Sequence, residues 1–136
     1  MENEKVKIQV EYWLKTSEHD YDTMLYLFRD KRYSDCLFFG HIILEKILKA
    51  FVVLKTRESA PMTHDLLSLA QKSGLDISKD EEKLLNEVNK FNIRVRYPDY
   101  LLQFYRICDQ EYTEEYLDKI QILWKKFVLR LKSLRF

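Results

Sequence analysis

The sequence predicts an all-α protein, an antiparallel up-and-down four-helix bundle with an additional short helix, and two observations lead to that class. Glycine and proline occur only twice each among 136 residues, whereas sandwiches and barrels need many tight turns. Apolar residues recur at helical spacing along most of the chain. Because 46% of the residues are hydrophobic, the chain can bury a core and is not disordered. Its length indicates a single domain, residues 1–136.

The first two helices are predicted over residues 5–28 and 33–55, with a short polar turn at 30–32 between them. The apolar spacing of the first helix includes Trp13, which we therefore expect to be largely buried. The second helix is apolar almost all round, and this indicates a central, buried helix. Within it, Cys36 is expected to act as a small buried hydrophobe.

A loop over residues 56–62 should separate the second helix from a short third helix at 64–72. Thr63 stands directly before that helix, and its hydroxyl can accept a backbone N–H of the first turn. Gly74 follows the last turn and suits a left-handed cap, because glycine adopts positive φ without a steric cost.

The fourth helix should begin near Ser78, because Glu81 stands three residues later and completes the spacing of a capping box. Pro98 interrupts this helix, since proline lacks the backbone N–H and clashes with the preceding turn. A short helical piece at 101–108 is expected after the interruption.

The last helix is predicted over residues 114–134, with Thr113 as its N-terminal cap. Trp124 lies on the apolar face of this helix and should be largely buried. Four long helices and a short one, joined by short connections, are typical of an antiparallel bundle.

A polar stripe interrupts the apolar second helix. His41, Glu45 and Lys49 are spaced four residues apart and therefore lie on one face. In one interpretation, Glu45 and Lys49 form a helix ion pair worth roughly 0.2–0.5 kcal/mol. In the other, the stripe lines a cleft between helices and orients a phosphate, a base or a ribose.

A second group of polar residues precedes Pro98. Arg94 and Arg96, with Tyr97 beside them, can clamp a phosphate, because a guanidinium binds phosphate oxygens bidentately. The alternative is a solvated helix end, where cations complement the negative end of the helix dipole.

No other feature indicates catalysis or a cofactor. The formal charge is +1, with 23 basic and 22 acidic residues, so the overall balance does not indicate nucleic-acid binding. Phosphate-loop, dinucleotide, metalloprotease, serine-hydrolase and CxxC motifs are absent from the sequence, and His19, His41 and His64 do not form a metal-ligand spacing. We therefore predict no metal and no cofactor. Two unpaired cysteines, no secretory signal and no long apolar run suggest a cytoplasmic protein without a membrane span.

The order of several short motifs is more specific than any one of them. In sequence order they are Trp13 with Asp20, Tyr33-Ser34-Asp35, FFGHIILEKILKAFV, THDLLSLA and NKFNIRVRYPDY, followed by a long amphipathic helix. The most specific parts are Glu45-Lys46 with Lys49-Ala50, Thr63-His64-Asp65-Leu66 and Arg96-Tyr97-Pro98. In this arrangement, nearly the whole chain closely resembles the HEPN family of small helical domains.

The resemblance implies a bundle of four antiparallel helices with an extra short helix. It also implies a homodimer, and a partnership with a separate minimal nucleotidyltransferase in a toxin–antitoxin-type system. Some members are proposed to bind nucleotides, and many catalytic members are metal-independent ribonucleases. The family's polar motif on the second helix, a Glu with a Lys or Arg four residues on, is matched by Glu45 and Lys49.

The sequence departs from the catalytic pattern of the family. That pattern is an Arg followed some five to seven positions later by a His, and no His occurs after His64. Ribonuclease chemistry needs a group that titrates near neutrality to move protons at the 2′-hydroxyl. We therefore expect a non-catalytic module that binds a nucleotide or RNA phosphate or a protein partner. The alternatives are an atypical ribonuclease toxin and a purely structural helical adaptor.

Aromatic residues make up 14% of the chain, more than one small core obviously needs. Tyr100, Phe104 and Tyr105 follow the interruption at Pro98 and are expected to form a surface patch. A self-complementary patch favours two-fold pairing, in keeping with a symmetric homodimer.

Overall fold

The computed structural model describes residues 1–134, and this part of the chain is helical, with no strand. The predicted all-α class is confirmed. The helices are α1 (Asn3–Arg29), α2 (Tyr33–Thr56), α3 (Leu66–Ser73), α4 (Lys79–Arg96), α5 (Pro98–Ile107) and α6 (Gln110–Ser133).

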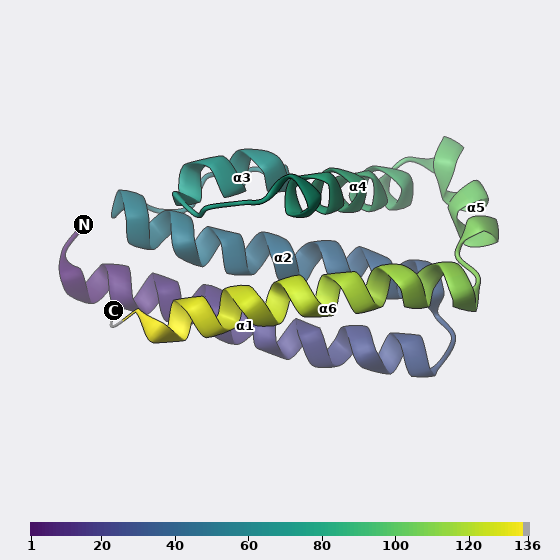
Figure 1. Cartoon of the computed structure of the whole chain (residues 1–136), viewed down its shortest axis with the longest axis horizontal. Coiled ribbons are helices and arrows are strands. Elements are labelled where there is room, and N and C mark those ends of the chain that lie inside the picture. The colour runs from purple at the N-terminus through teal and green to yellow at the C-terminus, as the bar shows by residue number, and fades with distance from the viewer. Residues whose placement is uncertain (135–136) are drawn as a thin grey trace.

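The second helix is central, as its apolar sequence predicts. It contacts each of the other five helices, and Figure 1 shows α1, α2 and α6 extended along the long axis of the molecule. Gly40 lets α6 approach α2 closely, because a Cβ at this position would lie 2.8 Å from the Cδ1 atom of Ile120. The apolar residues of α2 are therefore enclosed from several sides.

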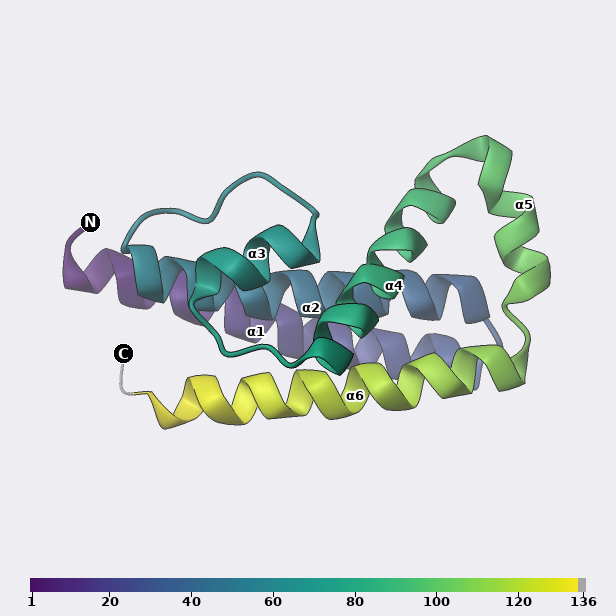
Figure 2. The ribbon, with the colours of Figure 1, turned by 45° about the horizontal axis from the view of Figure 1, so that its top comes forward.

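The remaining helices cover α2 on the side where the polar stripe lies. Figure 2 shows α4 crossing α2 obliquely, with α3 next to it and α5 at one end of the molecule. In the figures, α1 and α4 run in one direction along the molecule and α2 and α6 in the other. The residues between α2 and α3 form a long loop that brings the start of α3 back over α2.

The core between α1, α2 and α6 is built around one tryptophan. Trp124 is buried, its ring stacks on Tyr21 at 4.3 Å between centroids, and its Nε1 donates a hydrogen bond to the hydroxyl of Ser17. That hydroxyl in turn donates to the backbone oxygen of Ile43. The prediction for Trp124 is confirmed.

Trp13 packs against the core as predicted, but it is less completely buried than Trp124. Its ring lies at the edge of the α1–α2 contact, with the Lys49 ammonium 5.1 Å from the ring centroid and Tyr12 packed against it edge-on. Helical periodicity gave the correct face of α1, but not the extent to which neighbouring helices cover that face.

Two helix caps follow the prediction. Ser78 and Glu81 form the expected capping box at the start of α4, and Gly74 ends α3 with φ of 74°. Pro98 ends α4 as predicted and is itself the first residue of α5, where a missing N–H costs nothing.

Two other caps differ from the prediction. The N-terminal cap of α3 is Asp65, whose side chain accepts from the Leu67 N–H, whereas Thr63 accepts from the Asp65 N–H just before the helix. Asp109 caps α6, which begins four residues before the predicted start, and Thr113 is buried within its first turn. In both cases a carboxylate that accepts hydrogen bonds strongly lies near the predicted hydroxyl.

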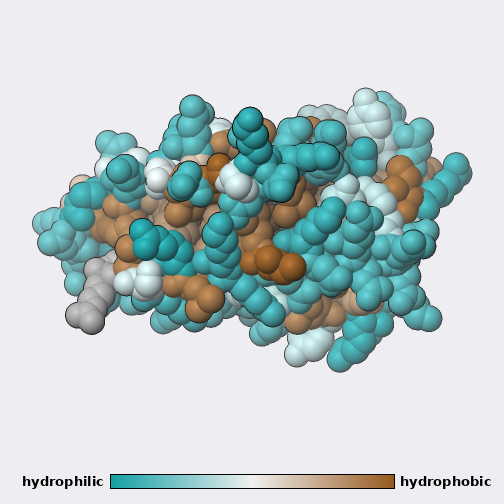
Figure 3. All heavy atoms as spheres, in the orientation of Figure 1, coloured by the Kyte–Doolittle hydropathy of each residue, from teal (hydrophilic) through white to brown (hydrophobic). Residues whose placement is uncertain are grey.

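The predicted aromatic patch is incomplete. Tyr100 and Tyr105 are exposed, but Phe104 is fully buried and stacks on Phe91 of α4. Phe104 lies on the single buried face of α5, which anchors this helix to α4. Figure 3 shows the molecule from the side of α6, where small hydrophobic patches lie between hydrophilic side chains.

Candidate functional site

Six polar residues from three parts of the chain form one connected network, which we call the α2 polar cluster. They are His41, Glu45 and Lys49 of α2, His64 of the segment before α3, and Asn92 and Arg96 of α4. Four of them were predicted as site residues from the sequence, and His64 and Asn92 were not.

Glu45 is held by two donors. Its Oε2 accepts a hydrogen bond from the Lys49 ammonium at 3.1 Å, and its Oε1 accepts one from Nδ1 of His64 at 2.8 Å. The Glu45 and Lys49 side chains are nearly buried, whereas the His64 side chain is 58% exposed. The ion pair predicted from the spacing of Glu45 and Lys49 is therefore present, and it supports a histidine that faces solvent.

A second chain of hydrogen bonds runs from Arg96 to His64 through the interior. Nε of Arg96 donates to Oδ1 of Asn92 at 2.8 Å, and Nδ2 of Asn92 lies 3.4 Å from Nδ1 of His41. Nε2 of His41 lies 2.8 Å from the backbone oxygen of His64. Because a guanidinium only donates and a carbonyl only accepts, each hydrogen position in the chain is determined: His41 accepts at Nδ1 and donates from Nε2.

His41 is neutral in this arrangement. The side chain is 0% exposed, and this burial lowers the pKa of His41 below its usual value, against the opposing effect of the Glu45 carboxylate. The 3.9 Å approach of Nδ1 to Glu45 is therefore not an ion pair. Through its two ring nitrogens, His41 joins α4 to the segment that carries His64.

The position of His64 is set by the caps around it. Asp65, the next residue, caps α3. Asn89 of α4 accepts from the Leu66 N–H through Oδ1 and donates to Asp65 through Nδ2. Together with the bond from His41 to the His64 backbone oxygen, these contacts fix the His64 main chain directly before α3.

Arg96 is exposed, but it is not loosely held. Besides the bond from Nε to Asn92, its guanidinium lies over the Phe38 ring, 5.5 Å from the centroid. Within residues 1–134 it forms no ion pair. Its two terminal nitrogens are thus presented to solvent in a defined orientation, which is how a guanidinium binds a phosphate bidentately.

Two predicted site residues lie apart from the cluster. Arg94 is directed to the other side of α4, where its guanidinium lies over Phe104 at 5.8 Å, and Tyr97 is exposed at the junction of α4 and α5. Arg94 and Arg96 are two residues apart, and a helix turns about 200° over that distance, so they cannot share a face. The predicted cleft therefore keeps one of its two arginines.

Signals for the two missed residues were present in the sequence. Asn92 follows Leu85 and Val88 on the buried face of α4, and an amide at an apolar position indicates a buried hydrogen-bond network. His64 stands in a polar trio before an apolar run, and capping accounts for that trio equally well. Neither signal identified Glu45 as the partner of His64 or His41 as a partner of Asn92, because Glu45 and His41 lie on another helix, α2.

The cluster can hold an anion and can supply an imidazole, but it offers no nucleophile. Burial raises the pKa of the Cys36 thiol to about 12, and Cys36 is buried in the core. A groove of about 610 Å³ lies elsewhere, between α4 and α6, and includes Leu84, Tyr116 and Ile122 among its lining residues.

No described helix, within residues 1–134, combines the length and apolarity that crossing a bilayer requires.

Comparison with known proteins supports the fold and identifies the family. No curated protein matches this sequence. The fold is similar to that of TT1696 from Thermus thermophilus, known from a crystal structure: the TM-score is 0.75 and the identity 22%, over 90% of this chain and 98% of that one. The family model of the HEPN domain matches residues 10–131, and the chain therefore belongs to the HEPN domain family.

Proposed function

We propose that this HEPN protein is a non-catalytic module that binds a phosphate group, carried by a nucleotide or an RNA, at the α2 polar cluster. The orientation of Arg96 is the observation that carries the proposal. Its Nε is engaged by Asn92 and its plane lies on Phe38, so less side-chain entropy remains to be lost when the terminal nitrogens bind.

The charges of the cluster support the same ligand. Glu45 and Lys49 neutralise each other, and within residues 1–134 Arg96 has no carboxylate partner. One positive charge, that of Arg96, therefore remains within the cluster, although the whole chain carries a formal charge of only +1. A phosphate complements that charge, and salt should weaken the binding by screening.

The experiment compares two arginines on one helix. Arg96→Ala should abolish binding of AMP or a short RNA in calorimetry at low salt, while Arg94→Ala, outside the cluster, should leave it within about a factor of two. Circular dichroism should be unchanged in Arg96→Ala because the Arg96 side chain is exposed, and the unfolding midpoint should fall only slightly because Oδ1 of the buried Asn92 loses its donor. If neither ligand binds the wild-type chain, the protein is a helical adaptor that works through protein contacts.

Glu45 provides a second test within the cluster. Removing a carboxylate next to a phosphate site can strengthen binding, but here Glu45 also holds Lys49 and the imidazole of His64. We expect Glu45→Ala to weaken binding, because both supporting donors lose their partner. Tighter binding of AMP by this variant would show that Glu45 opposes the ligand rather than organises the site.

We also propose the assembly that the family resemblance implies. Residues 1–136 would form a single domain with α1, α2, α4 and α6 as an antiparallel up-and-down bundle, working as a homodimer beside a minimal nucleotidyltransferase. The alternating directions of the four long helices support the bundle. Light scattering at tens of micromolar tests the dimer, and co-purification with a nucleotidyltransferase encoded by the neighbouring gene tests the partner.

A second candidate, an atypical ribonuclease, is favoured by one observation. His64 supplies the imidazole that is absent after Arg96 in the sequence, and the Glu45 carboxylate accepts its Nδ1 proton, as an orienting partner does for a general base. Incubation of labelled RNA with the wild-type chain and with His64→Ala separates the two functions. Cleavage that is lost in His64→Ala would replace the non-catalytic proposal.

A further inference from the structure

The exposed tyrosines of this chain are concentrated beside the α2 polar cluster. Within residues 1–134 five tyrosines are exposed, and three of them, Tyr97, Tyr100 and Tyr105, lie at the junction of α4 and α5 or on α5 itself. We call these three the tyrosine surface. Its first member directly follows Arg96, the exposed arginine of the cluster.

Helix geometry places Tyr100 and Tyr105 next to the rest of the molecule. Phe104 is the one buried residue of α5 and stacks on Phe91 of α4. Tyr100 precedes Phe104 by one turn and Tyr105 follows it directly, so both flank the anchored side of α5 rather than lie opposite to it. Tyr105 also lines a hollow of about 330 Å³ together with residues 31–35.

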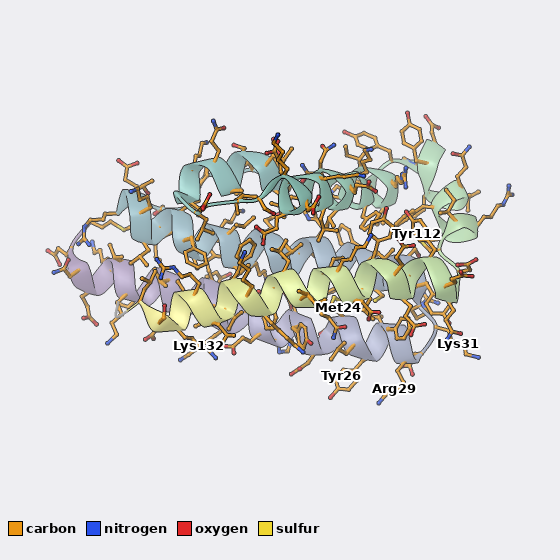
Figure 4. The ribbon with its side chains drawn as sticks, in the orientation of Figure 1. Met24, Tyr26, Arg29, Lys31, Tyr112 and Lys132 are labelled. Atoms are coloured by element: carbon orange, nitrogen blue, oxygen red, sulfur yellow. The ribbon has the colours of Figure 1, made fainter. Side chains whose placement is uncertain are left out.

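The hollow lies close to the arginine of the cluster. The Arg96 guanidinium lies over Phe38, and Phe38 is one turn along α2 from Ser34, which lines the hollow beside Tyr105. Lys31 lines the same hollow, and Figure 4 shows it at the end of the molecule that carries α5. Arg96 and the tyrosine surface are therefore neighbours along one stretch of α2.

The charges around the tyrosine surface favour a polyanion. The segment 93–107 contains three arginines, Arg94, Arg96 and Arg106, and one carboxylate, that of Asp99, so its formal charge is +2, compared with +1 for the whole chain. Within residues 1–134, Arg96 and Arg106 form no ion pair. Rings interleaved with unpaired cations are typical of surfaces that bind single-stranded nucleic acid.

We propose that the tyrosine surface stacks on the unpaired bases of a single-stranded polynucleotide, either RNA or DNA, while Arg96 holds one of its phosphates. The inference rests on the proposed function, because Arg96 supplies the phosphate contact. A mononucleotide has one base and can occupy one ring only, whereas a strand can occupy several. The bases of a duplex are already stacked on each other, so exposed rings fit a single strand better.

Calorimetry at low salt tests the ligand class. It compares AMP with RNA and DNA oligoadenylates of about eight nucleotides, and with a sugar-phosphate chain of the same length that lacks bases. At least one oligoadenylate should bind about tenfold more tightly than AMP and than the baseless chain, and the tighter of the two identifies the sugar. Equal binding with and without bases would overturn the proposal.

The same titrations separate this inference from the proposed function. If AMP binds but neither oligoadenylate binds more tightly, the phosphate site at Arg96 stands and the tyrosine surface is not a base-stacking surface. If neither AMP nor an oligoadenylate binds, both proposals fail.

Tyrosine variants test whether the rings themselves bind. Tyr100→Ala and Tyr105→Ala should each weaken oligoadenylate binding by about fivefold or more, but leave AMP binding within about a factor of two. The control is Tyr26→Ala, which removes a similarly exposed ring that also lies beside an arginine, Arg29, at 5.0 Å. Figure 4 shows both of these residues on α1.

Tyr26→Ala should leave the oligoadenylate titration unchanged. Equal titrations in Tyr26→Ala, Tyr100→Ala and Tyr105→Ala would contradict the proposal. A dimer seen by light scattering and lost in Tyr100→Ala, in a chain that binds no oligoadenylate, would assign the tyrosine surface to a second copy of the protein instead.

Discussion

The two sides of α2 differ in what they bury. Towards α6 the helix packs with hydrocarbon and rings: Gly40 lies against Ile120, and Phe51 meets Phe127 edge-on. Towards α3 and α4, the neighbouring residue His41 and the following Glu45 are also buried, but as members of a hydrogen-bonded network. One helix thus carries a packing face and a polar face.

The difference shows two ways in which burial constrains a sequence. On the packing face any side chain of suitable shape contributes, because the hydrophobic effect is non-directional. On the polar face each buried group needs a partner at the correct distance and angle, and a lost partner leaves an uncompensated polar atom. Mutations on the first face should act through volume, and mutations on the second through unpaired groups.

The largest effect is expected in the packing core. Trp124→Ala should reduce the free energy of unfolding by about 3–5 kcal/mol, since a buried ring is removed and a cavity is left. Trp13→Ala, at the half-buried tryptophan of α1, should cost about half as much. Urea unfolding followed by circular dichroism measures both, and equal losses would show that the two rings are equally enclosed.

On the polar face, Asn92→Ala should destabilise by about 1–3 kcal/mol, because Nδ1 of His41 and Nε of Arg96 both lose their partner. Asn86→Ala, at an exposed position of the same helix, is the control and should be near neutral. A near-neutral Asn92→Ala would mean that the polar face is no more demanding than the surface. Chemical unfolding midpoints of the two variants, measured in parallel, provide the comparison.

The polar face should also respond to pH. Burial lowers the pKa of His41 in the folded chain, whereas in the unfolded chain it returns to its ordinary value of 6.5. Below that value the unfolded state binds the proton first, so stability should fall as the pH is lowered from 7 to 5, by at most about 1.4 kcal/mol per pH unit.

The control for the pH experiment is His41→Gln, which removes the titrating group but keeps polar atoms at the position. Urea unfolding of both chains across this range should show a smaller slope in the variant. Carboxylates titrate mainly below the range and contribute little to it. Identical slopes in the two chains would assign the acid sensitivity to groups other than His41.

The smallest effect is expected at Gly40, next to His41 on the helix but on the packing face. Gly40→Ala adds a Cβ 2.8 Å from Cδ1 of Ile120, the flexible end of that side chain. The gain in helix propensity, about 1 kcal/mol, should offset most of the overpacking. We expect the free energy of unfolding, measured by thermal unfolding, to change by less than about 1 kcal/mol. A larger loss would show that α2 and α6 are packed too tightly to accommodate the added methyl group.

Much of the fold could be predicted from the sequence. The scarcity of glycine and proline, the apolar periodicity and the capping residues Ser78 and Gly74 led to the helical class and to most helix boundaries. The predictions of N-terminal helix caps failed where two residues that can each cap a helix stand close together in the sequence. A hydroxyl was chosen at Thr63 and Thr113 where the carboxylates of Asp65 and Asp109 form the caps.

The candidate site was predictable only along one helix. The spacing of His41, Glu45 and Lys49 placed them on one side of α2, because the helix repeat is a local property. The same helix repeat places Arg94 and Arg96 on different sides of α4, so only one of these arginines can face α2. Their membership in a phosphate site stays a prediction.

By itself, the sequence determined the helices, the central position of α2 and the Glu45–Lys49 pair, since each depends on residues within a few turns of one another. The tertiary structure alone decided that His64 binds Glu45, that Asn92 joins Arg96 to His41, and that the Trp13 side chain stays partly exposed to solvent. Glu45 and His64 are 19 residues apart along the chain, and His41 and Asn92 are 51 apart. Such contacts depend on how α4 crosses α2 and where the loop before α3 returns, which no local spacing encodes.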